Sequence, residues 1–154
     1  MKSIKLNILL ADDDIDDCIF FKKALEELQL SAHLTIVRDG EELMKYLEDH
    51  SAHLPDVLFL DLSMPRKTGF ECLTEIKESE KFKDIPVTVF TTSFAKGIDF
   101  EQHLANTLSR IGAEEYIRKP GDFEQLKQII HNVLVRVRNK GLLKGEDIIL
   151  RKFA

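Results

Sequence analysis

The chain of 154 residues has few of the features that mark secreted or membrane proteins. Only two cysteines are present, Cys18 and Cys72, and both fall in stretches with helical periodicity. Two such cysteines do not make a disulfide framework, and they indicate buried thiols of a reducing compartment. The apolar run at 8–11 is too short for a signal peptide and stops at aspartates. No run approaches the roughly 20 residues of a transmembrane helix, so we expect a cytoplasmic protein.

The chain also lacks any excess of basic residues. With 27 acidic and 22 basic side chains its net charge is −5, which argues against a general nucleic-acid binder because phosphates need neutralising charge. It has no internal repeat, no low-complexity tract and no linker rich in Pro, Gly and Ser. We therefore expect one domain over residues 1–140 and a C-terminal tail, 141–154, that is too short to be a second domain.

Two hydrophobic patterns alternate along the chain. Short apolar runs are typical of buried parallel strands, and apolar residues spaced by three and four are typical of helices. Gly141 stands where a helix C-cap would. Strands are predicted at 4–10, 33–37, 57–60, 87–90 and 115–118, and helices at 15–28, 41–50, 68–79, 99–110 and 122–139. This order predicts an α/β fold with a five-stranded, doubly wound parallel sheet and right-handed crossovers.

The stretch 55–71 is the centre of this pattern. Its apolar run at 57–60 has no polar alternation, which is typical of a strand buried on both faces. Asp61 follows at once, and Pro65 and Gly69 then break the strand. One carboxylate is therefore expected at the C-terminal end of a central strand, where open α/β sheets bind their ligands.

Polar side chains follow the other predicted strands in the same way. Asp12 and Asp13 follow the first strand, Thr91 the fourth and Lys119 the fifth, so we expect them to gather beside Asp61 at one edge of the sheet. Carboxylates this close repel one another, and an all-oxygen site suits Mg²⁺. A metal, a hydroxyl and an ammonium around Asp61 would support transfer of a phosphoryl group to its carboxylate.

Each of these residues also has a purely structural interpretation. The aspartates at 12–17 fit a solvated helix N-terminus, where negative charge is favourable. Thr91 alone would more often cap a strand end, and Lys119 alone would be a surface charge. His50 and His53 have the spacing of a metal pair, but no cysteine or third histidine accompanies them, so the structural interpretation is favoured.

The sequence resembles the receiver domains of two-component response regulators. The resemblance covers residues 4–138 and is carried in combination by L-L-A-D-D, L-D-L-S-M-P-R-K-T-G, P-V-T-V-F-T-T-S and Y-I-R-K-P. Among these domains, the chain is similar to the stand-alone, single-domain type that partners phytochromes. The resemblance implies the flavodoxin-like (βα)5 receiver fold.

It also implies roles for the metal and acceptor residues. Asp61 would be the phosphoacceptor and a ligand of Mg²⁺. Asp13 would bind the metal directly, Asp12 largely through metal-bound water, and Ser63 through its backbone carbonyl.

The remaining roles concern the response to phosphorylation. By resemblance Thr91 is the switch hydroxyl, Lys119 pairs with the phosphoryl oxygens, and Tyr116 is the aromatic switch residue. In the family the peptide bond between the lysine and the following proline is usually cis, which we therefore expect before Pro120.

The chain departs from the family pattern in three places. Ser63 stands where many receivers have Asn, which is expected to change the dephosphorylation rate more than metal binding. Thr92 is bulkier than the usual Ala or Gly and could narrow access for a phosphodonor or water. The segment 91–119 is also longer than in compact receivers, which is expected to change the geometry of the fourth helix.

The resemblance implies a signalling protein rather than an enzyme, one that catalyses only its own phosphorylation and slow dephosphorylation. A sensor histidine kinase or phosphotransfer protein would phosphorylate Asp61, and a downstream protein would bind the changed surface. The fourth helix, fifth strand and fifth helix are the expected face for that partner and the candidate face for a homodimer. No nucleic acid or membrane partner is expected.

Two other functions remain as alternatives. A pseudo-receiver would use the same fold for binding only, although the intact acidic pair and Asp61, Thr91 and Lys119 argue against it. A small phosphatase with Asp12 as nucleophile is suggested by the D-x-D in Asp12-Asp13-Asp14. That class needs a Thr or Val where Asp16 stands, and the chain has no room for a cap domain.

Overall fold

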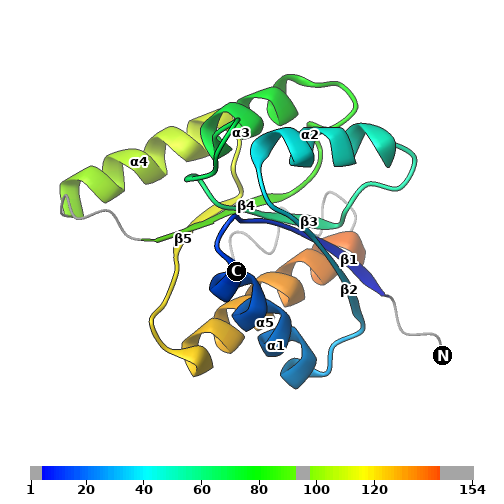
Figure 1. Cartoon of the computed structure of the whole chain (residues 1–154), viewed down its shortest axis with the longest axis vertical. Helices are drawn as coiled ribbons and strands as arrows, with labels where there is room; N and C mark the ends of the chain where they lie inside the picture. Colours follow the sequence, from blue (N-terminus) through cyan, green and yellow to red (C-terminus); the bar gives the residue numbers. More distant parts are fainter. Residues whose placement is uncertain (1–4, 93–97, 143–154) are drawn as a thin grey trace.

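The computed structural model describes residues 5–92 and 98–142 as a single sheet with helices on both faces (Figure 1). All strand pairs are parallel, and the strand order is β2-β1-β3-β4-β5. In Figure 1, α2, α3 and α4 cover one face of the sheet, whereas α1 and α5 cover the other. The elements are β1 Leu6–Ala11, α1 Ile15–Leu28, β2 Ala32–Val37, α2 Gly40–Asp49, β3 Val57–Leu60, α3 Gly69–Glu78, β4 Val87–Thr91, α4 Ile98–Ile111, β5 Glu115–Arg118 and α5 Phe123–Leu142. The predicted doubly wound α/β fold is confirmed.

The central strand β3 is buried throughout, as its uninterrupted apolar sequence predicts. Its side chains alternate between two cores. Leu58 and Leu60 belong to the core beneath α2, α3 and α4, and Val57 and Phe59 belong to the core beneath α1 and α5. In the second core, the rings of Phe21 and Phe59 pack edge to face with centroids 4.9 Å apart.

The strand register brings the candidate residues to one edge. Ala11, the last residue of β1, pairs with Leu60, the last residue of β3. The backbone N–H of Asp61 donates to the carbonyl of Ala11 at 3.0 Å, and that of Lys119 donates to the carbonyl of Thr91 at 2.7 Å. The residues that follow these strands therefore start from fixed, neighbouring backbone positions.

Side-chain caps define where the helices near this edge begin. Asp14 is the N-cap of α1, and its carboxylate accepts from the backbone N–H of Asp17 at 3.0 Å. Thr68 and Glu71 form a capping box at the start of α3. Asp14 thus has the structural role of a helix cap that was expected for the aspartates at 12–17, and it fixes the first turn of α1 above the sheet edge.

The C-terminal helix is longer than predicted. It continues through Gly141 to Leu142, so the prediction that Gly141 caps the helix is wrong. Lys140 in this last turn pairs with Glu114 at 2.7 Å, and a glycine within a helix costs only about 1 kcal/mol. Gly112, with φ of 129°, ends α4 as expected. The predicted loop at 96–97 and the tail from residue 143 lie outside the described residues.

Two further predictions about the chain concern its cysteines and membrane insertion. Cys18 and Cys72 are both free and buried, as predicted. Burial raises the pKa of the Cys18 thiol to about 11 and that of Cys72 to about 12, which makes both poor nucleophiles. Among the described helices, none combines the length and apolar character needed to cross a membrane.

Gly69 lets the turn after β3 pack against the backbone of the candidate site. A Cβ at this position would overlap the carbonyl oxygen of Asp61 and lie 2.7 Å from Leu62 Cα. Because these are backbone atoms, Gly69→Ala should lower the free energy of unfolding by roughly 2 kcal/mol, measured by urea denaturation. Gly121→Ala is the matched control, since nothing lies within 4 Å of a Cβ there. Equal stability of the two variants would contradict this account.

Candidate functional site

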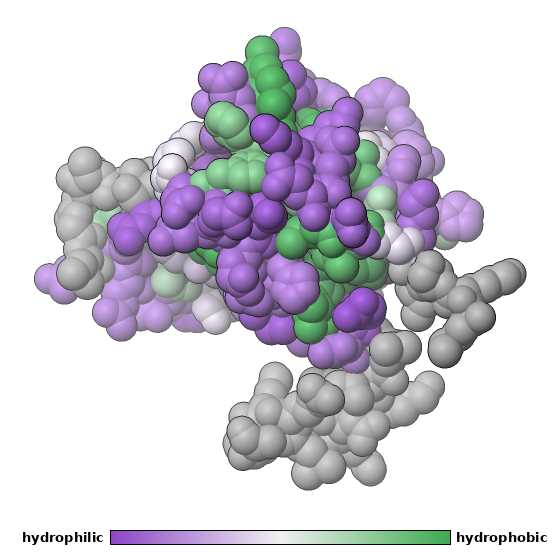
Figure 2. Space-filling model, turned by 90° about the horizontal axis from the view of Figure 1, so that it is seen from below, coloured by the Kyte–Doolittle hydropathy of each residue, from purple (hydrophilic) through white to green (hydrophobic). Residues whose placement is uncertain are grey.

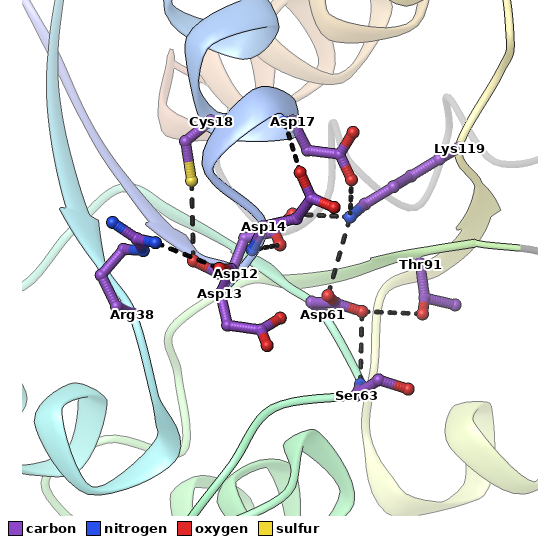
Figure 3. Close-up of polar contacts among 10 residues, drawn as sticks. All are labelled: Asp12, Asp13, Asp14, Asp17, Cys18, Arg38, Asp61, Ser63, Thr91 and Lys119. Carbon is purple, nitrogen blue, oxygen red and sulfur yellow. Dashed lines mark hydrogen bonds and ion pairs between the residues drawn. The ribbon is translucent and has the colours of Figure 1, made fainter.

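Three carboxylates meet at the C-terminal edge of the sheet (Figure 3). Asp12 and Asp13 follow β1, Asp61 follows β3, and one oxygen of each lies within 4.8 Å of the others. Asp12 and Asp61 are buried, whereas Asp13 is exposed. The structure therefore brings together the acidic residues that the strand ends predicted.

Asp61 accepts hydrogen bonds from two elements. Thr91 Oγ1 at the end of β4 donates to Asp61 Oδ1 at 2.8 Å, and the backbone N–H of Ser63 donates to the same oxygen at 3.3 Å. Lys119 Nζ lies 3.6 Å from the other oxygen, Oδ2. Thr91 and Lys119 thus approach the two oxygens of Asp61 separately, as Figure 3 shows.

Lys119 bonds most closely to two other carboxylates. Its Nζ donates to Asp12 Oδ2 at 2.6 Å and to Asp17 Oδ2 at 2.8 Å. Asp17 lies in the first turn of α1 and was not predicted as a site residue. Its place depends on the N-cap at Asp14, which sets the first turn of α1 and which the run of aspartates alone does not identify.

The charges of this cluster are unbalanced. Four carboxylates (Asp12, Asp13, Asp17 and Asp61) surround one ammonium, which gives a formal charge of −3 when all are ionised. Burial raises the pKa of Asp12 to about 6, although the hydrogen bond from Lys119 opposes this shift. Burial alone would lower the pKa of Lys119, but its hydrogen bonds to Asp12 and Asp17 outweigh that effect and raise it.

The donor set fits a small divalent cation. Hard carboxylate oxygens in a cluster of net negative charge are the ligands that Mg²⁺ and Mn²⁺ prefer. Asp13 is exposed and leaves room for metal-bound water, which Mg²⁺ tends to retain. The alternative in which Asp12 is a phosphatase nucleophile is disfavoured, because Asp12 is 1% exposed and already bonded to Lys119.

Three further predictions concern the peptide bond before Pro120, the side chain of Thr92 and the histidine pair. No peptide bond in the described ranges is cis, so the expectation of a cis bond before Pro120 is wrong; the long side chain of Lys119 reaches the carboxylates from a trans peptide. Thr92 is exposed beside the site. His50 bonds to the carbonyl of Tyr46 at 2.9 Å and stacks on its ring, which favours the structural interpretation of the His50–His53 pair.

Tyr116, the predicted aromatic switch residue, lies on β5 and packs against the core beneath α2, α3 and α4. Its hydroxyl is buried and has no hydrogen-bond partner among the residues that the structure describes. Burial also raises the pKa of Tyr116. A buried hydroxyl without a partner costs free energy, and a change in the position of the Tyr116 ring that gave the hydroxyl a partner would recover that energy.

Comparison with known proteins finds response regulators among the relatives of this chain. Residues 8–131 match the family model described as response regulator receiver domain. The probable methanogenesis regulatory protein FilR2 of Methanothrix harundinacea is 33% identical over 129 residues, which cover 82% of this chain and 79% of FilR2. Response regulator Rcp1 of Synechocystis is 37% identical over 90 residues, covering 56% of this chain and 61% of Rcp1.

Solved structures show the same similarity. The Mn²⁺-bound form of Rcp1 matches with a TM-score of 0.70 and 27% identity, covering 83% of this chain and 91% of that chain. The phosphorylated cyanobacterial phytochrome response regulator RcpA matches with a TM-score of 0.71 and 33% identity, covering 84% and 91%.

The raised pKa of Asp12 predicts that metal binding depends on pH. A carboxylate must lose its proton to bind a cation, and Asp12 keeps its proton below about pH 6. The dissociation constant for Mn²⁺ or Mg²⁺ should therefore rise about tenfold per pH unit below pH 6 and level off above pH 7. Titration calorimetry at several pH values measures this. Asp12→Asn should flatten the dependence of metal affinity on pH. A constant affinity between pH 5 and pH 7.5 in the wild type would refute the assignment of Asp12 as a metal ligand.

Proposed function

Because this chain belongs to the response regulator receiver family, we propose that it is a response regulator whose Asp61 accepts a phosphoryl group. The observation that supports this most directly is the position of Asp61, which lies at the end of β3 between Thr91 and Lys119. Residues 1–140 would form this receiver domain. A sensor histidine kinase or phosphotransfer protein would be the donor.

The chemistry assigned to the chain is nucleophilic attack. A carboxylate oxygen of Asp61 attacks the phosphorus of a phosphohistidine, the P–N bond breaks, and its electron pair stays on the imidazole nitrogen of the donor. The product is an acyl phosphate on Asp61. Thr91 supplies a hydroxyl donor and Lys119 a positive charge beside the new phosphoryl oxygens.

The proposed cofactor is Mg²⁺, which would neutralise charge on the phosphoryl oxygens when bound. We propose Asp12, Asp13 and Asp61 as its protein ligands, with the backbone carbonyl of Ser63 as a further one. The carboxylate cluster and the Mn²⁺-bound structure of Rcp1 support a divalent cation at this position.

The proposed switch follows from the charge that phosphorylation adds. A phosphoryl group carries about −1.5 to −2 charges and three strong acceptors. Thr91 would leave Asp61 Oδ1 and donate to the phosphoryl group, and Tyr116 would move with it. We propose α4, β5 and α5 as the face that then binds a downstream protein or a second copy of the chain.

The proposed approach of the donor is along α1. Three apolar residues of this helix are more than half exposed next to the site: Ile15 at 59%, Ile19 at 55% and Phe20 at 51%. Figure 2 shows apolar surface between charged groups on the face formed by α1 and α5. We propose that the phosphodonor protein packs against these residues while its phosphohistidine reaches Asp61.

Phosphorylation with acetyl phosphate and Mg²⁺ tests the acceptor directly. Intact-mass spectrometry should detect one phosphoryl group on the wild type and none on Asp61→Asn, because the nucleophilic oxygen is then part of an amide. Asp84→Asn is the control, since Asp84 is exposed and precedes β4 at the opposite edge of the sheet. Uptake by Asp61→Asn equal to that of the wild type would rule out this acceptor.

The switch role of Thr91 is tested separately from uptake. Thr91→Ala should still accept phosphate but should lose most of the beryllofluoride-induced change in backbone chemical shifts of α4 and β5, because no hydroxyl links Asp61 to β4. Thr91→Ser keeps the hydroxyl and should retain the change. A full response in Thr91→Ala would show that the signal bypasses Thr91, and an unchanged interaction profile in Asp61→Asn would favour the binding-only alternative.

A further inference from the structure

We propose that Asp17 is a positioning residue that holds the ammonium of Lys119 away from Asp61 until a phosphoryl group draws it across. Lys119 Nζ lies 2.8 Å from Asp17 Oδ2 but 3.6 Å from Asp61 Oδ2. The ammonium is therefore bonded to Asp17 in the first turn of α1, and to Asp12, rather than to the acceptor. This inference rests on the proposed phosphoacceptor role of Asp61.

Two short hydrogen bonds hold the ammonium of Lys119 on the side of Asp12 and Asp17. An ammonium has three N–H donors, and two of them are directed to Asp12 and Asp17 at 2.6 Å and 2.8 Å. The distance to Asp61 is too long for a hydrogen bond. The third N–H is available to one phosphoryl oxygen, and any second bond from Lys119 to the phosphoryl group would replace one of its two present contacts.

Burial determines which contact is given up. The side chain of Asp12 is 2% exposed, so leaving it without a counter-charge would be costly. The side chain of Asp17 is 35% exposed and lines a cavity of about 320 Å³ beside Phe20, Pro120 and Phe123. The Asp17 carboxylate can therefore rotate toward solvent when Lys119 moves, so the contact with Asp17 is the one that we expect to break.

The helix itself does not depend on this carboxylate. The N-cap contact of α1 joins the backbone N–H of Asp17 to the side chain of Asp14, so replacing the Asp17 side chain leaves the cap in place. Asp16 offers a matched control on the same turn. Asp16 is exposed, and its side chain makes no hydrogen bond or ion pair within the ranges that the structure describes. Its replacement by Asn changes the charge by the same amount.

The test compares Asp17→Asn and Asp16→Asn with the wild type at saturating Mg²⁺. Two quantities are measured: the affinity for beryllofluoride, and the maximal rate and half-saturating concentration for acetyl phosphate. With Lys119 free to reach Asp61, Asp17→Asn should bind beryllofluoride about fivefold more tightly and raise the maximal rate by a similar factor, the scale of a partly exposed ion pair. Asp16→Asn should stay close to the wild type. Asp17→Glu keeps the charge and should restore wild-type values.

The outcomes separate this inference from the proposed function. If the wild type takes up no phosphoryl group, the acceptor assignment itself fails. If the wild type reacts but Asp17→Asn matches Asp16→Asn, or is slower than the wild type, Asp17 does not restrain Lys119 and the inference is overturned. Asp17→Ser provides a second neutral side chain if Asp17→Asn is poorly folded, and it should show the same gain.

Discussion

The candidate site depends on one electrostatic constraint, which is that three carboxylates lie around a single ammonium and a fourth stands beside them. Lys119 contacts Asp12 and Asp17 directly and lies near Asp61, while Asp13 faces solvent. Such a cluster is held together by one positive charge and still carries a negative excess. It is therefore suited to attract a divalent cation and to respond when a further anion is added.

The sheet fixes the geometry of that cluster. Asp61 is tied to the end of β1 through its backbone N–H, and Lys119 is tied to the end of β4 in the same way. The turn at Gly69 packs directly against the backbone carbonyl of Asp61 and would not accommodate a Cβ. These contacts set the backbone positions of Asp61 and Lys119, so the long side chain of Lys119 can rearrange while its backbone stays in place.

The sequence predicted the parts of the site that strand ends determine. Asp12, Asp61, Thr91 and Lys119 follow or end strands of the sheet, and parallel strands end at the same edge. Asp17 escaped prediction because its place depends on the capping geometry that begins α1, which a run of aspartates does not specify. The end of α5 was also missed, because a glycine late in a helix resembles a cap until the contacts of that turn are known.

The two side chains beside Asp61 would respond to a phosphoryl group in different ways. Lys119 has a long, flexible side chain, so its ammonium can move while its backbone stays bonded to Thr91. Thr91 has a short side chain, so its hydroxyl can follow a phosphoryl oxygen only if the end of β4 moves with it. The conformational signal toward α4 and Tyr116 would therefore pass through Thr91, whereas Lys119 and Asp17 would set how readily the charged state forms.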